Sequence, residues 1–230
     1  MSIAENLTRI RTQIQSACER AHRDPDDVTL VAISKGHTPA SIREAFDSGL
    51  TVFGENKVQE LKLKVGQCPG SIQWEFIGHL QTNKCRDAAF CSKMIHSVDS
   101  LRVAEGLQNA CEKLAKTLPV LLEVNVSGEA TKYGFRPHEV LELLDELNQL
   151  DRLEIHGFMT MAPWSKEPEN ARPHFRRLKE LQKEAEDQLG APLPTLSMGM
   201  SGDFEIAIEE GATRIRLGTS LFGPRQKKKA

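Results

Sequence analysis

The chain has 230 residues, of which 39% are hydrophobic, and it carries a formal net charge of −2. This length provides one sizeable core and fits either one α/β barrel or two small domains. The near-neutral charge gives no electrostatic reason to bind nucleic acid or a membrane surface, and no apolar run approaches the roughly 18 residues of a membrane span.

The five cysteines are odd in number and show no C-x-x-C spacing, which argues against a disulfide framework or a zinc site. The seven histidines are scattered, with no pair at metal-ligand helical spacing. Glu5, Arg9 and Arg11 interrupt any apolar segment of the kind that a secretory signal needs. We therefore expect a cytoplasmic protein without a metal centre.

A capping box of Ser2 and Glu5 begins the first predicted helix, which ends near residues 20–22. After it, short apolar segments alternate with amphipathic ones. The predicted strands are 28–34, 51–53, 73–77, 94–97, 120–126, 153–159, 195–198 and 214–217. The predicted helices between them are 40–47, 58–64, 83–90, 100–116, 137–147, 173–189 and 203–210.

Eight strands that alternate with helices, with no linker between halves, predict a single (β/α)8 TIM-type barrel with an extra N-terminal helix. We assign residues 1–225 to this domain and expect 226–230, with its run of three lysines, to be a disordered basic tail. The alternative is an open doubly wound sheet. Against it, no strand is followed by G-x-G-x-x-G, and no G-x-x-x-x-G-K-[ST] occurs.

Two glycine-containing loops follow the seventh and eighth predicted strands, at residues 198–203 and 218–223. Barrels of this type often hold a phosphate there. The glycines let backbone N–H groups approach an anion, Ser201 and Thr219 add hydroxyls, and the helix predicted from residue 203 adds the positive end of its dipole. Each loop alone is ordinary turn chemistry, but together they predict a phosphate site.

Lys35 closes the apolar strand 28–34 and so places an amine at the edge of a low-dielectric site, where a lysine can become a Schiff-base nucleophile. The alternative is a solvated lysine that opens a turn. In strand 214–217 the alternation with Ile215 and Leu217 directs Arg216 into the barrel near the ligand end. There it either meets a ligand or forms an internal salt bridge.

Other polar residues at strand ends are expected to cap or to hydrogen-bond within the core; they are Glu55, Asn56, His79, Gln81 and Asn125. His96 and His156 are interpreted as satisfied interior histidines. Met159, Met161, Met198 and Met200 are interpreted as core or pocket-lining residues.

An amine, a phosphate site and an inward arginine together suggest an aldehyde-bearing phosphate, and pyridoxal 5′-phosphate (PLP) is the natural candidate. An arginine cannot accept a proton from the pyridine ring, so the ring nitrogen would stay unprotonated and the ring would be a weaker electron sink. This favours mild chemistry or the carrying of the cofactor.

Segments that together span nearly the whole chain also resemble the YggS/PROSC family, the pyridoxal phosphate homeostasis proteins. These proteins are similar to the N-terminal barrel of bacterial alanine racemase. The matching segments are 31–35, 53–60, 76–84, 95–100, 125–127 with Lys132 and Gly134, 156–159, 196–201, and 216–219 with Phe222 and Gly223. One departure is Gly36, where the family usually has threonine.

The resemblance implies that Lys35 holds PLP as a Schiff base, that Asn56 lines the cofactor and that Arg216 faces the pyridine nitrogen. It assigns the phosphate to Met200, Ser201, Gly218 and Thr219. It also implies a protein of PLP homeostasis and supply without robust catalysis, with apo PLP-enzymes as possible partners. We expect a monomer.

The residues offer some support for the non-catalytic role. Racemisation needs a base on each face of the cofactor, alanine racemase takes its second base, a tyrosine, from a separate C-terminal domain, and the sole tyrosine here is Tyr133. Two alternatives remain open. One is a PLP-dependent racemase or decarboxylase of the barrel class, and the other is a barrel that binds a different phosphorylated metabolite, with Lys35 serving only as a charge.

Overall fold

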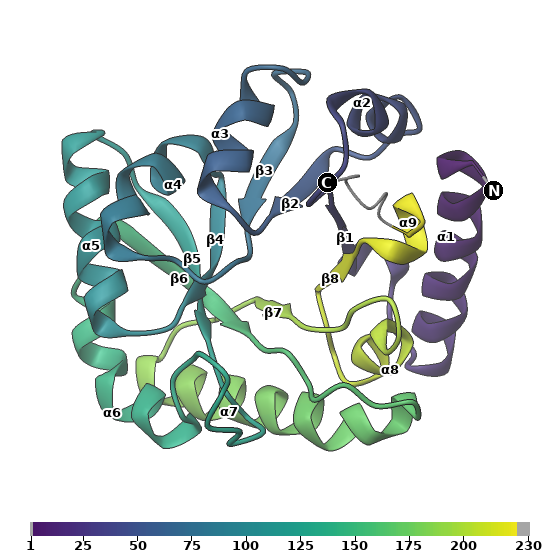
Figure 1. Ribbon diagram of the computed structural model, residues 1–230. Helices are drawn as coiled ribbons and strands as arrows, with labels where there is room; N and C mark the ends of the chain where they lie inside the picture. The colour runs from purple at the N-terminus through teal and green to yellow at the C-terminus, as the bar shows by residue number, and fades with distance from the viewer. Residues whose placement is uncertain (1, 225–230) are drawn as a thin grey trace.

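Eight parallel strands close into a barrel in the order β1 to β8 in the computed structural model, which describes residues 2–224 (Figure 1). β1 pairs with β8 from Thr29↔Arg214 to Ala32↔Leu217, which completes the ring. The strands are β1 (Thr29–Ile33), β2 (Val52–Glu55), β3 (Gln73–Phe76), β4 (Met94–Val98), β5 (Leu118–Glu123), β6 (Leu153–Met159), β7 (Thr195–Ser197) and β8 (Arg214–Leu217). The predicted barrel is confirmed, and the open sheet is excluded.

Helices surround the barrel on its outer side (Figure 1). They are α1 (Ile3–Arg20), α2 (Pro39–Asp47), α3 (Val58–Val65), α4 (Cys85–Cys91), α5 (Leu101–Lys113), α6 (Pro137–Asn148), α7 (Arg172–Leu189), α8 (Phe204–Glu209) and α9 (Thr219–Phe222). Three 3-10 turns are η1 (Pro25–Asp27), η2 (Thr82–Lys84) and η3 (Pro168–Ala171). Large apolar side chains such as Phe53 and Phe175 are fully buried between the helices and the strands.

The extra N-terminal helix α1 packs against α8 and α9 (Figure 1). Its capping box is present: Ser2 Oγ accepts from Glu5 N at 3.2 Å, and Ser2 N donates to a Glu5 carboxylate oxygen at 2.8 Å. The buried Asn6 amide donates to Leu221 O at 2.9 Å. The helix thus covers the point where the chain closes the barrel.

Most boundaries agree with the predictions to within a few residues. The helix predicted at 83–90 divides into η2 and α4, and the short strand predicted at 51–53 continues to Glu55, whose side chain is fully buried. The strand around His96 is confirmed despite its polar residue. The predicted basic tail, 226–230, lies outside the described residues.

The prediction for His156 is wrong. Its side chain is 38% exposed and its Nε2 lies 3.5 Å from a Glu154 carboxylate oxygen. The pairing of β5 with β6 passes from Val120↔Ile155 to Leu121↔Gly157, so His156 is the extra residue of a bulge. A bulge turns its side chain away from the inward-outward alternation of a regular strand.

Candidate functional site

A cavity of about 540 Å³ opens at the carboxyl ends of the strands, and all seven predicted site residues line it. They are Lys35, Asn56, Met200, Ser201, Arg216, Gly218 and Thr219. This volume lies within the 300–1,000 Å³ range of small-molecule sites. The barrel topology brings these residues together from the ends of β1, β2, β7 and β8, although they lie far apart in the sequence.

The loops after β7 and β8 are joined to each other at the cavity. Ser201 Oγ lies 3.0 Å from Ser220 Oγ and accepts from Ser220 N at 3.3 Å. Gly199 has φ +89°, and a Cβ there would lie 2.5 Å from the Ala207 Cβ. Only glycine therefore lets the first loop turn this tightly over α8.

Four backbone N–H groups in these loops, those of Ser201, Gly202, Gly218 and Thr219, have no acceptor within residues 2–224. Backbone amides that converge without partners are the donor set that a phosphate requires. The Met200 amide differs because it already donates to Asp203 Oδ1 at 2.6 Å. Burial raises the pKa of Asp203, and its hydrogen bond from Met200 and the nearby Arg216 oppose this shift. The residues present therefore fit a phosphate group.

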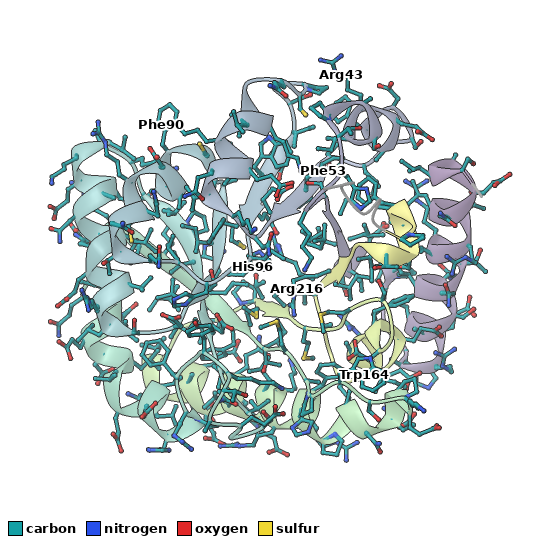
Figure 2. The ribbon with its side chains drawn as sticks, viewed as in Figure 1. Arg43, Phe53, Phe90, His96, Trp164 and Arg216 are labelled. Carbon is teal, nitrogen blue, oxygen red and sulfur yellow. The ribbon has the colours of Figure 1, made fainter. Side chains whose placement is uncertain are left out.

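Arg216 is buried in the barrel at 4% exposure (Figure 2). Its Nη1 donates to Ser197 Oγ at 2.7 Å and its Nη2 to Thr160 O at 2.9 Å. Burial lowers the pKa of this guanidinium to about 10, while nearby Glu123 and Asp203 oppose that shift. Arg216 therefore stays cationic near neutral pH, and the predicted inward orientation is confirmed.

A chain of hydrogen bonds fixes Arg216 from below. Ser197 Oγ also lies 2.9 Å from His96 Nδ1, and His96 Nε2 lies 2.8 Å from a Glu75 carboxylate oxygen. Because arginine can only donate, the Ser197 hydroxyl hydrogen is directed to His96 Nδ1, and His96 Nε2–H then donates to Glu75. Burial lowers the pKa of His96, in agreement with a neutral ring. The predicted interior role of His96 is confirmed.

Arg214 takes the alternative that was considered for Arg216. Its Nε donates to a Glu75 carboxylate oxygen at 3.1 Å, so it is the arginine with an internal salt bridge. The two arginines of β8 therefore have different environments: Arg214 neutralises Glu75 within the barrel, and Arg216 lines the cavity.

Sequence reasoning did not identify Glu123, the last residue of β5. Its side chain lines the cavity at 4% exposure, and no hydrogen bond to its carboxyl group occurs among the described residues. Burial, reinforced by Asp99 and opposed by Arg216, raises the pKa of this group to about 7. Its position could have been noticed in the sequence, because an acidic residue ends an apolar strand there. The same kind of signal, a charged residue after an apolar strand, identified Lys35.

His79 and Tyr133 also line the cavity, from the loops after β3 and β5. Their rings stack with centroids 3.7 Å apart at 13°, and His79 Nδ1 lies 2.8 Å from Asp99 Oδ2. Groups that can transfer protons therefore stand beside the site. In the sequence, the lack of an evident second base counted as support for a non-catalytic role. Because the sole tyrosine, Tyr133, lies at the cavity, that support is lost.

Asn125 organises the loop that carries Tyr133. Its Nδ2 donates to Glu129 O at 2.9 Å, and its Oδ1 accepts from Gly128 N at 3.0 Å. The predicted hydrogen-bonding role of Asn125 is confirmed. The methionine interpretation is also confirmed: Met159 and Met198 are buried, and Met161 and Met200 line the cavity.

Residues 2–224 contain no group of three or more metal-ligating side chains of the His, Cys, Asp or Glu type. Across the same residues, no helix combines the length and apolar character needed to cross a membrane. The five cysteines are all free thiols.

The family model for the alanine racemase N-terminal domain matches residues 6–226. A relative from Aquifex aeolicus, named pyridoxal phosphate homeostasis protein, is 44% identical over 227 residues, which cover 98% of this chain and 100% of the relative. This chain belongs to the alanine racemase N-terminal domain family and, within it, to the pyridoxal phosphate homeostasis proteins. The resemblance stated from the sequence is therefore confirmed.

Solved structures of the family extend the comparison. PipY of Synechococcus elongatus, solved with PLP bound, is 36% identical with a TM-score of 0.85, and the match covers 96% of this chain and 100% of PipY. Alanine racemase of Clostridium difficile 630 is 15% identical with a TM-score of 0.75, over 99% of this chain and 58% of the racemase. The second likeness concerns the fold alone.

Proposed function

We propose that this chain binds PLP in the cavity, holds it as a Schiff base on Lys35, and acts in intracellular PLP homeostasis. The observation that carries the proposal is the set of four open amides on the same cavity as Lys35. The homeostasis name of the Aquifex relative and the PLP in the PipY structure support it.

Each residue has a distinct task in this proposal. The amides of Ser201, Gly202, Gly218 and Thr219, with the Ser201 hydroxyl, receive the phosphate. Arg216 donates to the pyridine nitrogen, and Asn56 lines the cofactor. Met200 contributes its side chain, since its amide is engaged by Asp203.

We assign the protein a carrying role without robust turnover. When bound, PLP supplies an electron-withdrawing ring, whose strength depends on protonation of its nitrogen. Arg216 remains a cation that only donates, because a guanidinium has no acceptor. The ring nitrogen then stays unprotonated and the ring is a weak electron sink. The proposed recipients are apo PLP-enzymes, the proposed state is a monomer, and the free cysteines support a cytoplasmic location.

The test is borohydride reduction of the PLP-loaded protein followed by peptide mapping. We expect the reduced label on Lys35 and a visible absorption band that reduction abolishes. Lys84 and Lys132 serve as internal controls, because both lie near the site but outside the proposed linkage. A label on either of them overturns the assignment of Lys35. No band at all also overturns it and favours a barrel for another phosphorylated metabolite.

A PLP-dependent racemase or decarboxylase is the second candidate, and the Tyr133–His79 stack beside the cavity favours it. The loaded protein is incubated with a panel of amino acids, and racemisation and decarboxylation are followed over time. Sustained turnover that is lost in both Lys35→Ala and Tyr133→Phe establishes this candidate. No turnover above that of Lys35→Ala supports the carrier.

A further inference from the structure

A buried ion cluster lies next to Lys35, and neither the comparisons nor the proposed binding set includes it. It consists of Glu55 at the end of β2 and of Glu60 and Lys64 on α3. Lys64 Nζ donates to Glu55 Oε1 at 2.6 Å and to Glu60 Oε1 at 2.7 Å. The side chain of Lys64 is 6% exposed and that of Glu55 is 0% exposed.

The cluster also bonds the main chain on both sides of Lys35. Lys64 Nζ donates to Ser34 O at 2.7 Å, and Glu60 Oε1 accepts from Gly36 N at 2.7 Å. Ser34 Oγ donates to Glu55 Oε1 at 2.6 Å. These contacts reach the peptide group before Lys35 and the peptide group after it.

Fixing both peptide groups fixes the φ and ψ of Lys35, and these angles set the direction of its Cα–Cβ bond. This control matters because Lys35 lies two residues beyond Ile33, the last residue of β1, and precedes Gly36, which has φ +77°. A glycine in the left-handed region gives the chain freedom at the position where the lysine has to be aimed. The contact from Glu60 removes that freedom.

The free-energy cost of burying this ion cluster suggests that it positions the main chain and does not chiefly stabilise the fold. Removing a lysine and a glutamate from water costs several kcal/mol per ion, and well-packed apolar residues are often as stable as a buried ion pair. Burial raises the pKa of Glu55, partly offset by Lys64 and Ser34, and its Oε2 has no partner within the described residues. The clearest structural effect of this cluster is the pair of contacts that it makes with the main chain around Lys35.

We propose that Lys64 and Glu60 are positioning residues, which hold the main chain around Lys35 so that its amine meets the aldehyde of the ligand. The inference rests on the proposed Schiff base. Neither residue lines the main cavity, so they act through Lys35 and not on the phosphate.

The experiment compares Lys64→Met with Lys62→Met. Both lysines lie on α3, but Lys62 is 60% exposed and pairs with Asp87 on the surface. The probes are PLP and pyridoxine 5′-phosphate, which has an alcohol in place of the aldehyde and forms no bond with lysine. We expect Lys64→Met to weaken PLP binding by about tenfold or more and to slow formation of the borohydride-trapped bond, because misaimed groups react poorly.

Pyridoxine 5′-phosphate separates positioning from general damage. The affinity for pyridoxine 5′-phosphate should change less than about twofold in Lys64→Met, because the substitution leaves the loops 198–203 and 218–223, which we propose to hold the phosphate, unchanged. Equal loss of both ligands, or wild-type behaviour toward both, overturns the inference. If wild-type protein forms no reducible bond at Lys35, the proposed function has failed, and that result is visible before any variant is made.

Two further variants decide the question if Lys64→Met does not fold. The double variant Glu55→Gln/Lys64→Met leaves no unpaired buried charge while still removing the donor to Ser34 O. On α3, Glu60→Gln keeps an oxygen that can accept from Gly36 N, and Glu60→Ala does not. We expect glutamine to restore PLP binding relative to alanine. A Glu60→Ala protein that traps PLP at the wild-type rate contradicts the role of Glu60.

Discussion

The two sides of the cavity differ in how far their polar groups are hydrogen-bonded within the protein. On the side of β1, β2 and α3, the cluster of Glu55, Glu60 and Lys64 is bonded internally and to the main chain. On the side of β5, β7 and β8, four amides and the Glu123 carboxyl lack partners among the described residues. On the first side only Glu55 Oε2 of the cluster lacks a partner among the described residues, whereas the second side leaves four donors and an acid for a ligand. The main chain at Lys35 is thus held in place before any ligand binds, and the rest of the site is completed by what binds.

The largest expected effect tests the side of β1, β2 and α3. Lys35→Ala should abolish the borohydride-trapped linkage completely, because no amine remains at the end of β1. Mass spectrometry of the reduced protein measures it. Binding of pyridoxine 5′-phosphate should persist, since the phosphate loops do not depend on the lysine. Loss of both ligands would show that the two sides are not independent.

The next effect concerns Glu123, which unlike the buried Glu55 and Glu75 accepts no hydrogen bond at its carboxyl group among the described residues. Its pKa is raised from 4.5 to about 7, so between these values the folded state keeps a proton that the unfolded state has lost. The unfolding free energy therefore falls as pH rises through this window and levels off above it. Glu123→Gln escapes this loss and should exceed wild type by up to about 3 kcal/mol above pH 7, with little difference below pH 4.5.

Urea unfolding across pH measures this difference in cofactor-free protein. Glu105→Gln, at an exposed position of α5, is the matched control and should leave the pH profile unchanged. A Glu123→Gln profile parallel to that of wild type would mean that the Glu123 carboxyl group has the same pKa in the folded and the unfolded state.

A smaller effect tests the backbone of the open side. Gly199→Ala should lower the unfolding free energy by about 2 kcal/mol, because alanine is strained at φ +89° and its Cβ meets Ala207. Gly190→Ala is the control: its φ is +63°, but nothing lies within 4 Å of an added Cβ. Thermal unfolding ranks the two, and only Gly199→Ala should weaken PLP binding. Equal effects would remove the crowding argument.

The smallest expected effect is that of Ser201→Ala. Losing one hydroxyl donor and the link to Ser220 should weaken PLP and pyridoxine 5′-phosphate alike, by about five- to tenfold. Calorimetric titration with each ligand measures it. Thr8→Ala, on the exposed face of α1, serves as the control. A loss confined to PLP would place Ser201 with the anchor and not with the phosphate.

The sequence predicted the barrel and the rim at which the strand ends meet, because βα alternation determines which strand ends lie together. The family resemblance, and not this pattern, assigned Asn56 and Met200 to the ligand. The sequence did not predict the partners of the site residues. Lys64 reads as one of several helical lysines, and only the packing of α3 against β2 shows that it is buried. Tyr133 joins the site through the conformation of the chain after β5, whereas Glu123 lies at the end of β5 itself. The bulge at His156 depends on the pairing of β6 with β5, which a single strand pattern does not contain.

The two tryptophans give this molecule a built-in optical readout. Trp164, labelled in Figure 2, borders the cavity at 84% exposure. Trp74 is 4% exposed and belongs to the hydrophobic core. A chromophore entering the cavity comes close to Trp164, while Trp74 contributes a steady background from the interior. Stopped-flow fluorescence of the unlabelled protein can therefore time the arrival of a ligand separately from the bond formation proposed at Lys35. A Trp164→Phe variant identifies the source of the signal.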